Sequence, residues 1–230
     1  MSRFYHMNKF LLPILAVFLG FGIALLSKKQ NSWNTKLLLS FSGAFLLALT
    51  LFELLPEVYH HLDTKLAGLL IMGGILLQVT LELFSKGAEH GHVHIHKGHS
   101  TFPWTLFISL CIHSFLEGFS IHDHNDMVYG VLVHKVPIAT VITLFLMQSN
   151  YTKLQIGAFL LVFAFMTPLG TYISNNAHVV HSYTDMISAI VIGIFFHIST
   201  TILFESGDGH KFNLSKFIAI IVGVGIAYMI

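Results

Sequence analysis

The stretch CIHSFLEGFSI, Cys111–Ile121, decides the fold class of this chain. It places His113 and Glu117 four residues apart in an apolar run, about 102–121, that is long enough to cross a bilayer. Ionisable side chains are costly in hydrocarbon, so their presence within such a run indicates a function. On a helix, residues i and i+4 project from one face about 6 Å apart along the axis, which suits chelation of one divalent cation.

The composition is that of a membrane protein. Of the 230 residues, 54% are hydrophobic and 10% are charged, whereas soluble domains carry about 25% charged residues. A net charge of +1, with the basic residues at loop ends, argues against a nucleic-acid surface. The single cysteine, Cys111, excludes an internal disulfide and a cysteine metal knuckle. Histidines number 16 against 12 lysines and arginines, which is an unusual excess.

Apolar runs recur along the whole chain and predict an all-α integral membrane protein with eight transmembrane helices in a single domain. Each run approaches the roughly 20 residues that a spanning helix needs, although the last one is short. The predicted helices lie at about 9–27, 36–56, 65–84, 102–121, 127–148, 154–174, 186–205 and 213–230.

The distribution of basic residues predicts the orientation of these helices. With the N-terminus outside, the short inner loops carry most of the lysines, as cytosolic loops do. These inner residues are Lys28, Lys29, Lys36, Lys86, Lys97, Lys153, Lys211 and Lys216, and the outer ones are Arg3, Lys9 and Lys65. The bias requires an even number of helices, so we expect both termini to face outward.

A histidine-rich tract occupies the loop at 86–101, between the third and fourth predicted helices. Its histidines are His90, His92, His94, His96 and His99. Alternating histidines make poor core material, and such tracts usually contact transition metals. The simpler alternative is a solvated linker that binds metal weakly. Because Gly91 and Gly98 keep the tract flexible, we expect a cytosolic loop rather than a rigid site.

The fifth predicted helix contributes a second histidine at the same depth in the membrane. At a rise of 1.5 Å per residue, His113 and His134 both fall about 12 Å below the outer surface. Three ligand-type side chains at matching depth on adjacent helices define a site. We therefore expect His113, Glu117 and His134 to converge on one divalent ion.

Four segments, in this order along the chain, resemble motifs of the ZIP (Zrt/Irt-like) metal transporters. They are GAFLLALTLFELLPE (Gly43–Glu57), HSFLEG (His113–Gly118), HKVPIA (His134–Ala139) and TPLG (Thr167–Gly170). They resemble the family's second helix, its H-N-x-x-E/D-G signature, its H-E-x-P-H-E motif and an E-P-L-G motif of some bacterial members. The resemblance covers nearly the whole chain and implies a 3+2+3 inverted repeat, with helices 1–3 related to 6–8.

Many members of this family hold two adjacent metal ions in the membrane, and the resemblance implies that this chain keeps one position. The first position corresponds to His113, Glu117, His134 and Ile138, of which three are able to bind metal. The second corresponds to Ser114, Lys135, Ile138 and Thr167, none of which is a carboxylate. We expect Lys135 to act as a tethered cation in place of the second metal, paired with Glu117.

Three further polar residues lie in predicted helices. Glu53 stands where the family often has a histidine, and it either passes metal along the path or is structural. His197 either supplies a fourth ligand or hydrogen-bonds to serine and threonine neighbours. Glu82 falls close enough to a helix end to be interfacial.

The function that the resemblance implies is import of a divalent metal, most directly Zn²⁺, by alternating access at one mid-membrane site. Fe²⁺, Mn²⁺, Co²⁺ and Cd²⁺ stay open as cargo, because nitrogen-rich ligation favours zinc-like ions without ranking them. The alternatives are a non-transporting metal sensor, motivated by the degenerate second position, and an intramembrane zinc hydrolase. No H-E-x-x-H motif is present, so we do not expect an enzyme.

The partners expected for such a protein are a divalent metal ion and the lipid bilayer, without nucleic acid. A homodimer stays open. The expected location is a cell membrane that the chain crosses several times, and the short chain without a large outer domain suits a bacterial inner membrane.

Overall fold

Helices make up almost all of the computed structural model, which describes residues 2–26, 32–85, 103–121, 126–148, 151–177, 182–205 and 214–230. The elements are α1 (Ser2–Leu26), α2 (Ser32–Leu49), η1 (Thr50–Leu54), α3 (Leu55–His61), α4 (Thr64–Ser85), α5 (Trp104–Glu117), η3 (Gly118–Ser120), α6 (Met127–Gln148), α7 (Lys153–Asn176), α9 (Thr184–Glu205) and α10 (Leu214–Met229). Because α2, η1 and α3 are continuous, and α5 continues into η3, these elements form eight helical segments within the described ranges. The predicted all-α class is confirmed.

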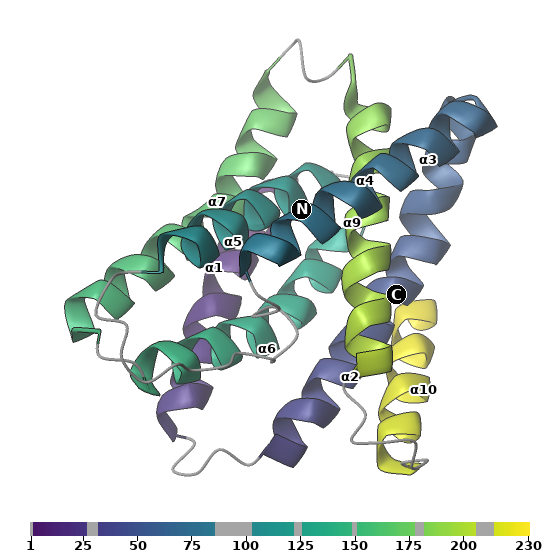
Figure 1. The fold of residues 1–230 in the computed structure, drawn as a ribbon. Coiled ribbons are helices and arrows are strands. Elements are labelled where there is room, and N and C mark those ends of the chain that lie inside the picture. Colours follow the sequence, from purple (N-terminus) through teal and green to yellow (C-terminus); the bar gives the residue numbers. More distant parts are fainter. Residues whose placement is uncertain are drawn as a thin grey trace.

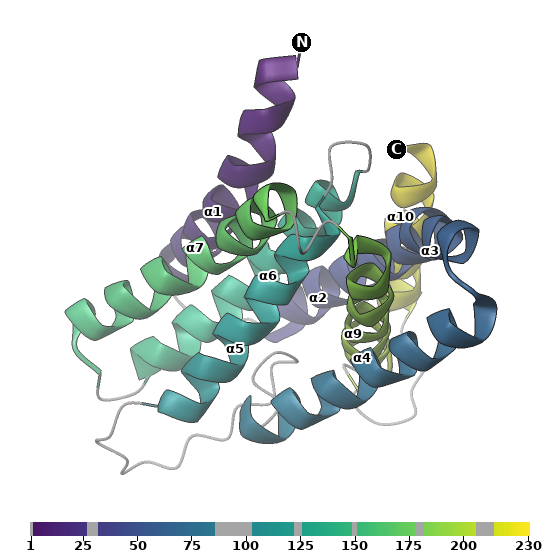
Figure 2. The same ribbon diagram turned by 90° about the horizontal axis from the view of Figure 1, so that it is seen from above.

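Six of these segments are long and apolar enough to cross a membrane. They are Asn8–Leu26, Lys36–His61, Thr64–Phe84, Met127–Met147, Lys153–Asn176 and Thr184–Phe204. The helices α5 and α10 are shorter, with 14 and 16 residues. Figure 2 shows the start of α1 and the end of α10 on the same side of the helices, as an even number of spans requires. Which side of the membrane that is stays a prediction, as does the inverted repeat.

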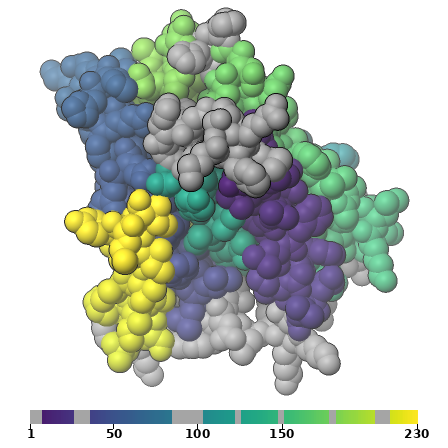
Figure 3. Space-filling model, turned by 180° about the vertical axis from the view of Figure 1, so that it is seen from behind, coloured from purple at the N-terminus to yellow at the C-terminus, as the bar shows by residue number. Residues whose placement is uncertain are grey.

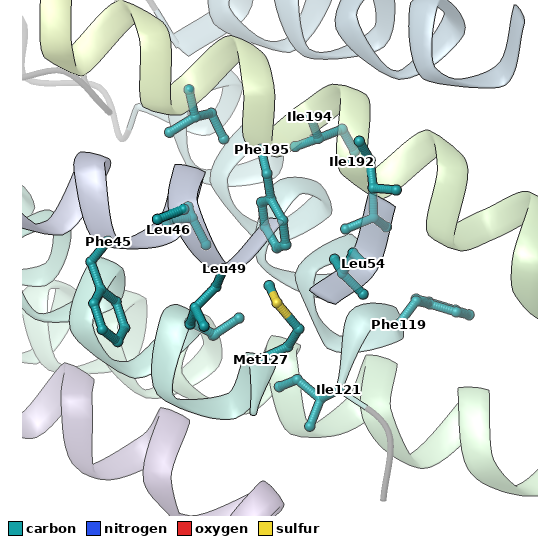
Figure 4. Packing of buried hydrophobic residues seen from close by; sticks show 14 of the residues in the cluster. Phe45, Leu46, Leu49, Leu54, Phe119, Ile121, Met127, Ile192, Ile194 and Phe195 are labelled. Atoms are coloured by element: carbon teal, nitrogen blue, oxygen red, sulfur yellow. The ribbon is translucent and has the colours of Figure 1, made fainter. Parts of the chain in front are cut away.

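The helices pack in two groups that meet where α2 contacts α6 and where α4 contacts α5 (Figure 1). One group is α1, α5, α6 and α7, and the other is α2, α4, α9 and α10. Figure 3 shows α1 and α10 on one face of the molecule, with parts of α2 and α6 between them. Each group has its own apolar cluster, and the first turns of α6 belong to the cluster of the second group. In that cluster Leu49, Leu54, Met127 and Phe195 point toward one another (Figure 4).

The second helical segment changes its hydrogen-bonding pattern just before Pro56. Residues Thr50–Leu54 form a π-helical turn, in which the Leu55 N–H donates to the Thr50 carbonyl. Proline has no N–H, so it cannot complete the ordinary bond to the carbonyl four residues earlier, and a widened turn accommodates the gap. The helix therefore continues beyond the predicted end at about 56, to His61. Glu53 lies inside the π-helical turn.

Glycines bring α5 and α7 into backbone contact. A Cβ atom on Gly118 would meet the Thr167 carbonyl, and one on Gly170 would meet the Phe115 carbonyl. In lipid, where apolar burial gives helices little reason to associate, such close packing by small residues holds them together. The crossing places Thr167 beside the end of α5.

We expect Gly170→Ala to destabilise the protein, because the added methyl meets backbone rather than a flexible side chain. Overpacking of this kind costs about 1–3 kcal/mol in free energy of unfolding. Gly157→Ala on the same helix is the matched control, since a Cβ there meets nothing within 4 Å. Thermal unfolding in detergent measures both variants. Equal midpoints for the two would show that the crossing has room that the structure does not indicate.

Candidate metal centre

The helices α5 and α6 bring three potential metal ligands together. His113 and Glu117 lie one turn apart on α5, and His134 lies on α6. At most 1% of each residue is exposed. One ligand atom from each can be chosen so that all three lie within 4.8 Å of one another.

The distances within this group suit a single small cation. His113 Nε2 lies 3.0 Å from Glu117 Oε1, and His134 Nε2 lies 3.9 Å from the same oxygen. Tetrahedral zinc, with bonds of about 2.0–2.1 Å, separates neighbouring ligand atoms by about 3.3 Å. The two observed distances bracket this value, so small side-chain rotations would bring the three atoms around one ion. Two imidazole nitrogens and one carboxylate oxygen are ligands typical of borderline divalent metals.

Lys135 occupies the other side of the Glu117 carboxylate. Its Nζ donates to Glu117 Oε2 at 2.6 Å and to Ser114 Oγ at 2.5 Å. The ammonium also lies over the ring of Phe163, 4.7 Å from its centroid. The two oxygens of Glu117 are thereby divided, with Oε1 toward the histidines and Oε2 toward the lysine. The Phe163 contact was not foreseen, because nothing in the sequence indicates which face of α7 meets α6.

Ser114 and Thr167 complete a hydrogen-bonded ring with Lys135 and Glu117. The Ser114 and Thr167 hydroxyls lie 3.1 Å apart, and Thr167 Oγ1 donates to the Ser114 carbonyl at 2.9 Å and to Glu117 Oε2 at 3.2 Å. Ser114, Lys135 and Thr167 thus gather around one carboxylate oxygen. Ile138, the remaining degenerate position, is buried in the apolar cluster of α1, α5, α6 and α7.

Two helices that line this centre each contain a proline beside the residues concerned. Pro137 lies two residues after Lys135 on α6, and Pro168 follows Thr167 on α7. Each proline removes one backbone hydrogen bond from its helix, which loosens the turn that carries the polar side chain.

The structure gives Glu53 and His197 other partners. Glu53 Oε2 accepts a hydrogen bond of 3.0 Å from the backbone N–H of Asp126, directly before α6. His197 Nε2 lies 2.5 Å from Oε2 of Glu82, a residue on α4 that the sequence indicated only as interfacial. Neither Glu53 nor His197 belongs to the group of three. The residues of the histidine-rich tract, His90, His92, His94, His96 and His99, lie outside the described residues.

The fold and this centre define a multi-pass membrane protein with a buried group of metal-ligand type. Residues 85–230 match the family model described as "ZIP Zinc transporter", which is more than half of the chain. The chain therefore belongs to the ZIP family, a family of transporters. The matched region contains α5, α6, α7, α9 and α10, and so all three members of the group.

Curated relatives carry the same family name. Zinc transporter ZIP1 of Plasmodium falciparum (isolate 3D7) is 30% identical over 133 residues, which cover 54% of this chain and 37% of the relative. Zinc transporter ZIP1 of Danio rerio is 36% identical over 89 residues, 36% of this chain and 29% of the relative. Zinc transporter ZIP1 of Takifugu rubripes is 36% identical over 87 residues, which cover 34% of this chain and 29% of the relative. The matches thus span about a third of the length of these relatives.

Proposed function

We propose that this chain transports a divalent metal ion, Zn²⁺ first among the candidates, through a single site formed by His113, Glu117 and His134. The observation that carries the proposal is the burial of these three residues between two helices of a ZIP-family membrane protein. The names of the relatives support zinc as the cargo. Fe²⁺, Mn²⁺, Co²⁺ and Cd²⁺ are the further candidates.

The number of ligands suits transport better than permanent binding. A transported ion must be held strongly enough to lose its water and weakly enough to leave again. Structural zinc sites use four protein ligands, whereas this group offers three. All three are buried in the state described, so the ion would reach them only after the helices around them move. Alternating exposure of the site to the two sides follows from this requirement.

Lys135 sets the number of ions in this proposal. Its ammonium lies where a second ion would share Glu117, and it supplies positive charge at that place. A buried carboxylate without a cation would be costly, so the lysine also keeps Glu117 ionised while the metal is absent. With Oε2 engaged, Oε1 stays directed toward the histidines. The result is a one-ion site whose carboxylate is oriented before the ion arrives.

The proposed direction of transport is import into the cytoplasm, which is what the resemblance to ZIP transporters implies. With both termini outside, as expected, α5 begins at the cytosolic side and the lysine-rich loops are cytosolic. A bacterial inner membrane is the proposed location. A homodimer is compatible with this function but is not required by a site that lies within one chain.

Metal flux into liposomes tests the function. Purified protein in liposomes that contain a zinc-sensitive dye should give uptake that saturates with external Zn²⁺. A sensor, which the degenerate second position would suit, binds the ion without flux. Binding in detergent together with no flux in either direction would contradict the transport proposal and favour the sensor.

We expect deletion of Glu89–His99 to leave measurable flux in the same liposomes, because the three proposed ligands lie outside this loop. The loop contains histidines but only one carboxylate, Glu89, and its expected role is capture of metal after passage. The control is a variant in which the five histidines are replaced by serine and the length of the loop is unchanged. Complete loss of flux in both variants, with the proteins still folded, would place the loop in the translocation path.

A further inference from the structure

Outside the metal centre, a second histidine and carboxylate meet between α4 and α9. His197 Nε2 and Glu82 Oε2 lie 2.5 Å apart, although 115 residues separate them in the sequence. Their side chains are 18% and 22% exposed, so both are partly accessible, unlike those of the centre. The pair is thus held by tertiary packing and is only partly buried.

Further residues of α4 and α9 lie on the same helical faces as this pair. Gly74, Gln78 and Glu82 follow one another at intervals of four on α4, and Gly193 and His197 do so on α9, so each set shares one helical face. Gly74 and Gly193 bring the backbones together, since a Cβ on Gly74 would meet the Ile190 carbonyl and one on Gly193 the Ile71 carbonyl. We call these five residues the α4/α9 seam. Gln78 is fully buried and lies one turn from Glu82.

We propose that Glu82 and His197 form a second divalent-cation site, to which the Gln78 amide oxygen can contribute. An imidazole nitrogen and a carboxylate oxygen are the same ligand types as in the centre, and they suit zinc-like ions. Tetrahedral zinc places neighbouring ligand atoms about 3.3 Å apart, so the pair must open by less than about 1 Å. Water completes the coordination, which makes the site weaker and faster to exchange than the centre.

The position of the seam gives this site a place in the transport path, a step that rests on the proposed function. The carbonyl of Leu81, next to Glu82, accepts a hydrogen bond of 2.7 Å from Ser109 Oγ. Ser109 lies one turn before His113 on α5, on the side that the lysine distribution assigns to the cytosol. The α4/α9 seam therefore flanks the inner side of the centre, and the chain after α4 leads into the histidine-rich tract. An ion that leaves the centre would meet Glu82 and His197 next.

The Glu82–His197 contact could be a structural hydrogen bond between α4 and α9 or a cation site. Only a cation site binds metal, so a measurement of metal binding distinguishes the two roles. The test uses the full chain in nanodiscs with His113→Ala and His134→Ala, which remove the centre, and with the five tract histidines replaced by serine. We expect one Co²⁺ per chain, detected by its visible absorption. His197→Gln and Glu82→Gln should each abolish that signal. His61→Gln is the control and should keep the Co²⁺ signal. His61 also lies beside a carboxylate, that of Asp185 at 3.2 Å, but this pair is on the exposed surface.

Loss of the Co²⁺ signal could also result from misfolding, so a further variant is designed to gain a new absorption band. In the same background with Cys111→Ser, His197→Cys should give a thiolate-to-cobalt charge-transfer band, whereas Ile187→Cys on the same helix should not. Absence of bound Co²⁺ in the background, or a signal that survives both His197→Gln and Glu82→Gln, would overturn the site. The assay involves no transport, so a failure of liposome flux leaves its outcome unaffected.

Discussion

His134→Ala is expected to reduce Zn²⁺ uptake into liposomes by about 100-fold or more. Loss of residues that only orient a metal ligand lowers metal affinity about 10- to 100-fold, and loss of one of three ligands should exceed that. Without His134 the site keeps only His113 and Glu117, both from α5, so the ion no longer joins two helices. Initial rates over a range of external Zn²⁺ measure the effect, with His61→Ala as the control.

The type of metal provides a second readout for the same residue. His134→Cys keeps a ligand but makes it a soft thiolate, which favours Cd²⁺ over Co²⁺. We therefore expect this variant to recover Cd²⁺ uptake more than Co²⁺ uptake. A purely structural histidine would not give a recovery that depends on the metal. If His134→Ala takes up both metals as fast as the unaltered protein does, His134 is not a ligand of the transported ion.

The part of the centre that the sequence could predict is the part set by helix periodicity and depth. His113 and Glu117 share a face because they are four residues apart, and His134 falls at the same depth because both helices leave one loop. These arguments use local geometry only. The position of Lys135 was also within reach, since a lysine so deep in the membrane needs an anion and Glu117 was near.

The contacts that the sequence did not predict depend on how helices rotate about their axes. Glu82 was read as interfacial from its place near the end of α4, whereas it faces His197 because Gly74 and Gly193 fix how α4 and α9 cross. Apolar periodicity is a weak guide to rotation in lipid, where the outside of a helix is as apolar as its inside. The π-helical turn around Glu53 was missed for another reason. The apolar run predicts a helix only to about 56, so it does not indicate how the helix accommodates Pro56 and continues to His61.

Lys135→Ala is expected to weaken metal binding at the centre about 10- to 100-fold, the range for loss of a residue that orients a ligand. Without the ammonium, Glu117 Oε2 keeps only the Thr167 hydroxyl among the contacts that now surround it. A buried carboxylate so weakly paired takes up a proton or turns toward another donor, and either change removes Oε1 from the histidines. Isothermal titration with Zn²⁺ measures the affinity of the centre in a background that carries Glu82→Gln and has the five tract histidines replaced by serine. Lys65→Ala on the exposed start of α4 is the control.

Restoring acidic residues should reverse the effect of the lysine and admit another ion. In the double variant Lys135→Asp with Thr167→Glu, two carboxylates flank Glu117 Oε2 in place of an ammonium and a hydroxyl, so that oxygen can bridge two metals. We expect the number of Zn²⁺ ions bound at the centre to rise from one to two, counted in a background that also carries Glu82→Gln. Thr167→Glu alone should not add an ion, because Lys135 would pair with the new carboxylate. If Lys135→Ala binds and transports normally and the double variant still holds one ion, Lys135 does not stand in for a metal, and its contact with Glu117 is only a means of burying two charges.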